Sequence, residues 1–261
     1  MKILSLIDGK FTKYISVFDR GFNYGDGFFE TMRWSVIDET NLGKVEFWRR
    51  HLKRLKLGCQ KINIVFSQNI IESYKNKILK NAIKNGIRKG ILKLIITRGV
   101  GGRGYRFETK MKPSIIFLLF PDVEIKPIFY KNGVDITFCT NQLSSNSYIG
   151  GTKSLNRLDS VLAASEFDEK LYFEGIVTNS LGQIIEGTKT NLFILKNKIL
   201  YTPIINSVGI KGIVREVIIE KGLNYFSKIQ ESYLKKEDLN QAESIFLTNS
   251  ICKVIPVKKI N

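Results

Sequence analysis

Apolar residues in the first 120 positions fall into short runs that predict a sheet. Three such runs, at 27–36, 91–97 and 115–120, are rich in β-branched and aromatic residues, as strands are. Asp8 and Gly9 stand between two further apolar runs, and an Asp-Gly pair in that setting predicts a tight hairpin.

Helical spacing of apolar residues appears twice between these predicted strands. Over residues 47–60, Leu52, Leu55 and Cys59 recur at intervals that place them on one side of a helix. A second helix is expected from the N-cap candidate Ser67 to Gly86. Its expected buried stripe consists of Ile70, Ile71, Tyr74 and Ile78.

The second half of the chain changes character after residue 120. Residues 121–132 contain two prolines and no clear period, so we expect an interdomain linker there. A strand is expected at 133–139, and a long amphipathic helix from about Lys153 with Leu155, Leu158, Val161 and Leu162 on one side. A strand-rich stretch, helices near 211–221 and 232–242 and a strand at 244–248 follow.

The pattern predicts a mixed α/β (α+β) fold in two domains. The smaller N-terminal α/β domain is expected over residues 1–120, and the larger, strand-rich C-terminal domain over residues 133–261. With 43% apolar and 25% charged residues, the 261-residue chain has the composition of an ordinary globular protein. No apolar run is long enough to predict a signal peptide or a membrane span.

Cysteine and histidine are scarce, which excludes several kinds of site. Cys59, Cys139 and Cys252 are isolated and form no CxxC pair, so we expect a reducing cytoplasm and no metal site. His51 is the only histidine, which leaves Ser-His-Asp catalysis without a basis.

The formal net charge of +17 raises the question of nucleic-acid binding. The lysines are scattered, however, and no nucleic-acid-binding motif accompanies them. We therefore expect neither a nucleic-acid nor a membrane partner. A basic field of this kind suits a small anionic substrate.

Gly99, Gly101 and Gly104 form a literal GxGxxG, the pattern of dinucleotide-binding loops. In such loops the glycines follow a strand and open a helix, whose N-terminal N–H groups face the phosphates. Here a strand precedes them, but the chain then reaches Pro113 without a helical period and returns to another strand. The pattern therefore predicts a strand-to-strand loop that carries Arg103, not a dinucleotide site.

Two single residues stand out for chemistry. Lys153 follows the loop SYIGGT and begins an apolar stretch; a lysine in that place is often only a solvated helix end. Glu186 is an acid within a strand-rich region, where a turn or an edge position is the ordinary explanation. Spacing alone does not decide between a structural and a chemical role for either residue.

The order of motifs along the chain carries more information. FDRGFNYGDGFFETMR, HLKRL, RGVGGRGY, GTKSLNRLDSVLAASE, EGTKTNLF, KGIVRE and FLTNSICKVIPV follow one another. In this order they resemble the fold-type IV pyridoxal-phosphate enzymes, the class IV aminotransferase family. The resemblance runs from about Asp8 to Val257. It implies the two-domain architecture of that family and pyridoxal 5'-phosphate as the cofactor.

The resemblance assigns roles to individual residues. Lys153 matches the family lysine that forms a Schiff base with the cofactor, which requires an amine. Glu186 matches the acid that keeps the pyridine nitrogen protonated, and Arg54 matches the arginine that binds the cofactor phosphate. The rest of the phosphate site is expected from main-chain N–H groups of Ile213, Val214, Asn249 and Ser250.

Within the family, the chain is most similar to the aminodeoxychorismate lyases. Leu158 stands where branched-chain aminotransferases carry Tyr, and Thr31 stands where the lyases have a threonine close to the catalytic lysine. The loop RGVGGRGY also resembles the lyase loop. The resemblance therefore implies a catalytic role for Thr31. It assigns substrate binding to Arg103, Tyr24 and Tyr105.

The implied activity is the conversion of 4-amino-4-deoxychorismate to 4-aminobenzoate and pyruvate in folate biosynthesis. A D-amino acid or branched-chain amino acid aminotransferase is the alternative, because one fold supports several reactions. The resemblance also implies a cytoplasmic homodimer that acts on a small anionic molecule.

Overall fold

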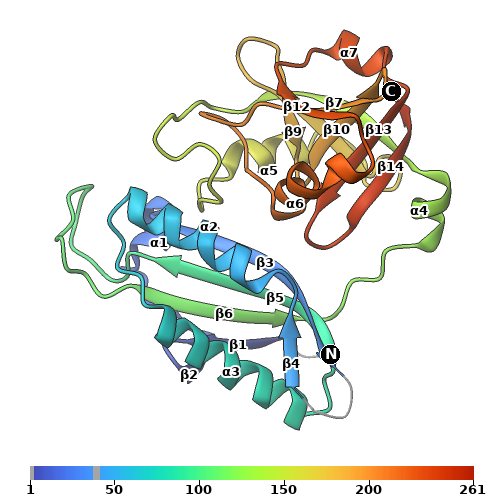
Figure 1. Cartoon of the computed structure of the whole chain (residues 1–261). Coiled ribbons are helices and arrows are strands. Elements are labelled where there is room, and N and C mark those ends of the chain that lie inside the picture. The colour runs from blue at the N-terminus through green and yellow to red at the C-terminus, as the bar shows by residue number, and fades with distance from the viewer. Residues whose placement is uncertain (1–2, 38–41) are drawn as a thin grey trace. The chain divides into compact units, whose positions relative to one another are not determined.

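The computed structural model describes residues 3–37 and 42–261 and divides the chain into two compact units (Figure 1). The first unit consists of the chain up to Glu124 together with Thr152–Asn156. The second consists of Ile125–Gly151 and Arg157–Asn261.

A six-stranded antiparallel sheet forms the centre of the first unit. Its strands, in spatial order, are β2 (Lys10–Phe11), β1 (Leu4–Ile7), β6 (Ser114–Phe120), β5 (Lys89–Thr97), β3 (Gly27–Ile37) and β4 (Leu42–Val45). The helices of this unit are α1 (Arg20–Tyr24), α2 (Trp48–Lys61) and α3 (Gln68–Lys84). Alternate residues of β3 and β5, among them Met32 and Leu94, form one apolar core with α2 and α3.

Most of the predicted elements of this unit are present. Ile7 pairs with Lys10 across a two-residue turn in which Asp8 and Gly9 both have positive φ, so the hairpin is confirmed. Ile71 and Ile78 are buried in α3, but Ile70, predicted to be buried with them, is 44% exposed. It lies one residue outside the stripe that faces the sheet.

An eight-stranded mixed sheet forms the second unit. In spatial order it contains β12 (Lys228–Ser232), β11 (Ile199–Pro203), β10 (Asn191–Lys196), β13 (Ser244–Asn249), β14 (Lys253–Ile260), β7 (Val134–Gln142), β8 (Glu174–Thr178) and β9 (Ile184–Gly187). Its helices are α4 (Pro127–Asn132), α5 (Leu158–Ala164), α6 (Ile213–Lys221), the 3-10 turn Gly222–Asn224 and α7 (Lys236–Asn240). The strand-rich stretch and the helix near 211–221 are therefore confirmed.

The long helix predicted from Lys153 is wrong. Residues 153–155 are extended and pair with the start of β3: Phe29 N donates to Lys153 O (2.9 Å) and Leu155 N to Gly27 O (2.9 Å). Because β4 covers only the far end of β3, the backbone of residues 27–29 is available for this pairing. The helix begins only at Leu158, whose side chain is 69% exposed.

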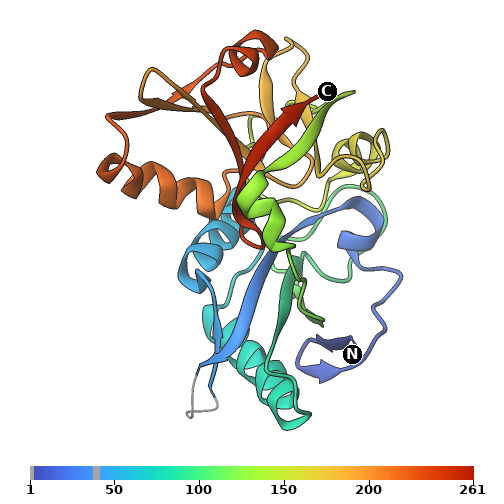
Figure 2. The same ribbon diagram turned by 90° about the vertical axis from the view of Figure 1, so that its right-hand side faces the viewer.

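Two stretches differ from the domain division expected from the sequence. The expected linker at 121–132 contains α4, which packs against β14 (Figure 2). The segment Thr152–Asn156, expected in the C-terminal domain, groups with the first unit because its main chain pairs with β3.

The helix expected at 232–242 is shorter than predicted, because β12 continues to Ser232.

Across residues 3–37 and 42–261, the helices are all too short or too polar to cross a lipid bilayer. In the same residues, no three His, Cys, Asp or Glu side chains gather in a way that would hold a metal ion.

Candidate active site

Lys153 is held against strand β3 by main-chain pairing and by an aromatic contact. Its ammonium nitrogen lies 4.5 Å from the centre of the Phe29 ring. The neighbouring Ser154, 2% exposed, pairs with Phe28 across the same ladder. The lysine is half-buried. An amine in this setting has a fixed stem and a defined position, unlike a lysine at a solvated helix end.

Thr31 and Lys93 share the sheet face on which Phe29 lies. Side chains alternate along β3, so Phe29 and Thr31 project to the same side, and Thr31 is directly opposite Lys93 of β5. The Lys93 nitrogen is 4.9 Å from the centre of the Phe29 ring, and burial lowers the pKa of Lys93. Two amines therefore contact one ring beside a hydroxyl.

Arg54 lies in a buried network on the other face of β3. Its Nε donates to Oε1 of Glu30 (2.8 Å), and its Nη2 donates to Oε2 of the same carboxylate. Glu30 is 1% exposed and contacts Nδ1 of His51 at 2.6 Å. Since an ionised carboxylate only accepts hydrogen bonds, we assign the proton of His51 to Nδ1. The geometry therefore fixes the plane of the Arg54 guanidinium.

This network determines the ionisation of its members. Burial alone would raise the pKa of Glu30, but the charge of Arg54 and the hydrogen bonds from His51 and Arg54 outweigh it and lower the pKa to about 2. Burial lowers the pKa of His51 despite Glu30, and the charges of Arg54 and Lys153 lower it further. Lys153 is thus close enough to act electrostatically on His51, in a locally positive setting.

Glu186, in the second unit, is a buried carboxylate on β9. Its Oε2 accepts a hydrogen bond from the main-chain N–H of Ile210 (2.9 Å) and one from Nδ2 of Asn191 (3.2 Å). The side chain is 5% exposed. Glu186 is therefore an oriented, buried carboxylate: it does lie on an edge strand, as its surroundings suggested, but it is not an exposed turn residue.

Asn191 connects this carboxylate to the start of α6. Its Nδ2 also donates to Ile210 O (2.8 Å), and a Cβ added to Gly212 would lie 1.9 Å from its Oδ1. A side chain at that position, which is the N-cap of α6, would therefore displace the Asn191 amide. The first N–H groups of a helix have no partner within the helix, so those of Ile213 and Val214 face its N-terminal end.

The second expected main-chain group lies at the end of β13, which packs against α6. Asn249 accepts hydrogen bonds at Oδ1 from the N–H groups of Ile251 and Cys252 (2.8 and 2.7 Å), so its side chain shapes the turn that contains Ser250. Thr248 precedes this turn and is opposite Asn191 in the ladder. Its hydroxyl is buried and has no hydrogen-bond partner.

Each unit, taken by itself, contains groups of the kinds that bind part of a phosphate-bearing pyridine cofactor. The second unit provides an oriented carboxylate, the N-terminal end of a helix and an orphan buried hydroxyl at Thr248. The first unit provides a positioned amine and an oriented guanidinium. A helix N-terminus and a guanidinium suit phosphate oxygens, and an amine is the group that binds an aldehyde.

The glycine loop, defined here as residues 99–107, connects β5 toward β6 and contains no regular structure. Gly99 has φ of +92° and a Cβ there would lie 2.0 Å from Lys112 O, so a strand-to-strand turn requires this glycine. Arg103 is exposed on the loop. Tyr105, 84% exposed, contacts Tyr24 of α1 edge-on at 5.6 Å between ring centres.

A model of the class IV amino-transferase family matches residues 27–260 of the chain. The chain belongs to this family. Membership indicates pyridoxal 5'-phosphate as the cofactor. The fold-type IV prediction is confirmed with it.

Both lyases and aminotransferases are similar to the chain. It is 26% identical over 257 residues to aminodeoxychorismate lyase of Vibrio harveyi, an alignment that covers 98% of this chain and 90% of the relative. It is 32% identical over 259 residues to a Methanocaldococcus jannaschii protein named "Putative branched-chain-amino-acid aminotransferase", with 98% and 85% covered. The crystal structure of 4-amino-4-deoxychorismate lyase from Pseudomonas aeruginosa superimposes with a TM-score of 0.90 at 28% identity, covering 99% and 92%.

Three residues beside the expected site were missed by the sequence reasoning. Lys93 interrupts the apolar run at 91–97, and the period of a strand is the signal that would have placed it on the face of Phe29. Asn191 and Arg20 lie within quoted motifs, but their hydrogen bonds to the carbonyls of Ile210 and Gly104 span 19 and 84 residues. No local pattern reveals such contacts.

The Glu30 network predicts a pH-dependent stability. Replacing Glu30 by Gln is expected to lower the free energy of unfolding at pH 7 by about 3 kcal/mol, the equivalent of a pKa shifted from 4.5 to about 2. Because the pKa in the folded state lies below that in the unfolded state, this stabilisation is complete above pH 4.5. It is lost as the pH falls toward 2. Urea unfolding of both proteins at several pH values measures it.

Glu72→Gln is the matched control. Glu72 forms an ion pair with Lys75 at 2.6 Å, but its side chain is 33% exposed, so we expect a loss below about 1 kcal/mol. A gap between wild type and Glu30→Gln that stays constant from pH 7 down to pH 2.5 would contradict the assigned pKa.

Proposed function

We propose that the protein is a pyridoxal-phosphate-dependent lyase that converts 4-amino-4-deoxychorismate to 4-aminobenzoate and pyruvate, a reaction of folate biosynthesis. The observation that carries the proposal is the basic sheet face beside Lys153, where Lys93 lies opposite Thr31. A substrate with two carboxylates requires cations close to its reacting carbon. The relatives named as lyases support the same reaction.

The residues that would hold the cofactor are those that the sequence resemblance assigned. Lys153 would bind its aldehyde carbon, and Glu186 would hold the proton on its ring nitrogen. Arg54 and the main-chain N–H groups of Ile213, Val214, Asn249 and Ser250 would bind its phosphate. When bound, pyridoxal phosphate supplies an electron sink for the carbon next to the substrate nitrogen.

The chain's own groups would then move a proton and orient the substrate. Once the substrate amine has taken its place, the free Lys153 amine would remove the proton from the substrate ring carbon next to the amino nitrogen, and Thr31 would orient that proton transfer. Arg103 and Lys93 bind carboxylates, and Tyr24 and Tyr105 contact the ring. Loss of the enolpyruvyl oxygen, which leaves with pyruvate, is favoured because the remaining ring becomes aromatic.

We also propose that the protein acts as a homodimer in the cytoplasm. The three cysteines, Cys59, Cys139 and Cys252, are all free and buried. Burial raises their pKa values to about 11 or 12, which keeps them as unreactive thiols. Free thiols suit a reducing compartment.

Size-exclusion chromatography with light scattering tests the proposed homodimer.

A branched-chain or D-amino acid aminotransferase is the second candidate. The 32% identity to the Methanocaldococcus jannaschii protein favours it, because that relative bears an aminotransferase name. The two candidates differ in one requirement. An aminotransferase needs a keto acid to receive the amino group, whereas the lyase releases 4-aminobenzoate and pyruvate without one.

The first prediction for this function is formation of 4-aminobenzoate by the cofactor-loaded protein from aminodeoxychorismate alone, measured by fluorescence. Lys153→Ala is expected to abolish product, because an alanine offers no amine to bind or to accept the proton. Borohydride should fix the cofactor covalently on Lys153, identified by peptide mapping. Keto-acid-dependent transfer from leucine or D-alanine without 4-aminobenzoate would favour the aminotransferase instead.

Glu186→Gln tests the ring-nitrogen assignment. We expect the cofactor to stay bound while the rate falls by about 100-fold or more, because an amide does not hold the ring nitrogen in its protonated form. Absorption spectra and single-turnover rates measure both quantities. Glu231→Gln, at a carboxylate that is 46% exposed and pairs with Arg215, is the control and should turn over normally. Equal rates in both variants would leave Glu186 a structural residue.

Arg103→Ala tests the proposed carboxylate contact. Loss of a charge-assisted bidentate contact costs about 2–3 kcal/mol, so KM for aminodeoxychorismate should rise about 30- to 150-fold with little change in cofactor affinity. Arg103→Lys should recover only part of the loss, because an ammonium lacks the planar fork. Steady-state kinetics measure KM, and cofactor titration measures the affinity for the cofactor. An unaltered kcat/KM in Arg103→Ala would reduce the loop to a simple turn.

A further inference from the structure

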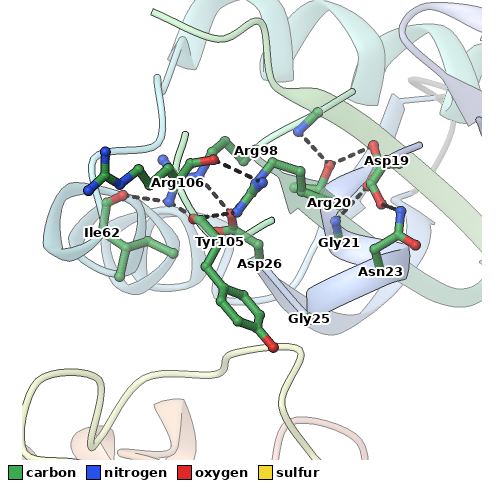
Figure 3. Close-up of polar contacts among 12 residues, drawn as sticks. Asp19, Arg20, Gly21, Asn23, Gly25, Asp26, Ile62, Arg98, Tyr105 and Arg106 are labelled. Carbon is green, nitrogen blue, oxygen red and sulfur yellow. Dashed lines mark hydrogen bonds and ion pairs between the residues drawn. The ribbon is translucent and has the colours of Figure 1, made fainter. Parts of the chain in front are cut away.

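Arg20, the first residue of α1, is a buried arginine that contacts the glycine loop. Its side chain is almost entirely shielded from solvent, and Figure 3 shows its guanidinium among the polar groups of Asp26 and the loop. Nη1 donates to the carbonyl oxygens of Gly104 (2.9 Å) and Arg106 (3.4 Å), and Nη2 donates to that of Tyr105 (3.0 Å). Three consecutive carbonyls of an irregular segment therefore bind one cation.

The first part of the loop is held by the main chain around Arg20. Arg20 N donates to Gly99 O (2.9 Å) and Gly101 N to Phe18 O (3.3 Å), and Asp19 bridges to Val100. The loop thus has two attachments to the same segment. Backbone pairing fixes residues 99–101, and one side chain fixes residues 104–106.

Asp26 keeps the Arg20 guanidinium in place and shares it with a second arginine. Arg20 Nε donates to Asp26 Oδ2 (2.9 Å), and Arg98 binds both oxygens of Asp26, at 2.7 and 3.0 Å. Arg98 also donates to the carbonyls of Ile62 and Asn63 and lies 3.6 Å from the centre of the Phe107 ring. The cluster therefore connects both halves of the loop to the end of α2.

Asp26 is ionised in this cluster. Burial would raise the pKa of Asp26, but the hydrogen bonds and charges of Arg98 and Arg20 outweigh it and lower the pKa below its ordinary value. Asp26 therefore accepts hydrogen bonds from both guanidinium groups and fixes their orientation beside the loop.

The carbonyl contacts also determine which groups face outward. In a trans peptide the C=O and N–H point in opposite directions, and the described residues contain no cis bond. Peptide groups whose carbonyls face Arg20 therefore turn the N–H groups of Tyr105, Arg106 and Phe107 away from it. The Arg20 guanidinium carbon lies 4.8 Å from the centre of the Tyr24 ring, which contacts Tyr105.

We infer that Arg20 is a positioning residue for substrate recognition. It holds the glycine loop in the single conformation that presents Arg103 and Tyr105, and it supports Tyr24, so that the loop binds a carboxylate-bearing substrate. Lysine does not replace it, because one ammonium cannot span Asp26 and three carbonyls. The inference rests on the proposed function for the identity of the anion, but not for the conformation of the loop.

Arg20→Met tests the inference in the cofactor-loaded protein, because methionine retains an apolar stem and removes the guanidinium. We expect trypsin to cleave after Arg103 and Arg106 about 10- to 100-fold faster than in the wild type, because the loop loses hydrogen bonds to a charged group. KM for aminodeoxychorismate should rise by a similar factor while kcat changes less than about threefold. Arg20→Lys should restore a minor part of both.

Arg33→Met is the matched control for loss of a partly buried arginine. Arg33 forms an ion pair with Asp122 and donates to Val123 O (2.7 Å), far from the loop in sequence, so cleavage at the loop should keep the wild-type rate. An unchanged absorption spectrum of bound cofactor in Arg20→Met would show that the protein is folded and loaded.

A pair of adjacent glycines tests the same contact from the loop side, should Arg20→Met fail to fold. A Cβ at Gly101 would lie 2.6 Å from Cε of Met111 and 2.9 Å from Cδ of Arg20, whereas a Cβ at Gly102 meets nothing within 4 Å. Gly101→Ala should accelerate tryptic cleavage after Arg103, and Gly102→Ala should not. Equal cleavage in wild type, Gly101→Ala and Arg20→Met would overturn the inference.

The cleavage assay separates this inference from the proposed function. If the wild type forms no 4-aminobenzoate, the lyase proposal fails, yet faster cleavage in Arg20→Met and Gly101→Ala would still support the positioning role. If the wild type is a lyase and Arg20→Met opens the loop without raising KM, the loop does not bind the substrate, and the inference is wrong.

Discussion

The main-chain pairing of residues 153–155 with strand β3 is the interaction on which the proposed site depends. Successive side chains of β3 project to opposite faces of the sheet, so Glu30 faces the helices and Phe29 lies on the opposite face. The backbone of residues 27–29 in the same strand pairs with the segment that carries Lys153. One strand therefore positions the amine, its aromatic contact and the carboxylate that orients Arg54.

Each of the buried carboxylates Glu30 and Asp26 binds two partner side chains at once, and this arrangement orients the partners. Glu30 binds Arg54 and His51, and Asp26 binds two arginines, so each carboxylate stays ionised at low exposure. Such pairs contribute less to stability than their short distances suggest, because both partners lose hydration. Their consistent effect is directional: a guanidinium fixed by several acceptors has one orientation, which a binding site requires.

The glycines explain why a dinucleotide motif occurs without a dinucleotide site. Gly99 is required by its positive φ and by the nearby carbonyl of Lys112, and a Cβ at Gly101 would meet the side chains of Met111 and Arg20. The same residue type at the start of α6, Gly212, is required by Asn191. In each case a Cβ would meet a neighbouring group, and no phosphate is needed to explain the pattern.

The sequence by itself determined the elements that depend on local periodicity. It predicted the hairpin at Asp8 and Gly9, the strands β3, β5 and β6 and the helices α2 and α3, because alternation and helical spacing are properties of neighbouring residues. The ordered motifs also indicated the family and nominated Lys153 and Glu186. Whether those side chains have the assigned roles remains a prediction.

Only the tertiary structure decided what residues 153–155 and Arg20 do. Leu155 and Leu158 carry an apolar spacing that favours a helix, yet the unpaired edge of β3, more than 120 residues earlier in the chain, imposes an extended conformation on Leu155. Arg20 binds carbonyls 84–86 residues away. Contacts at such separations leave no periodic trace in the sequence, because they depend on which backbone groups the folded sheet leaves without partners.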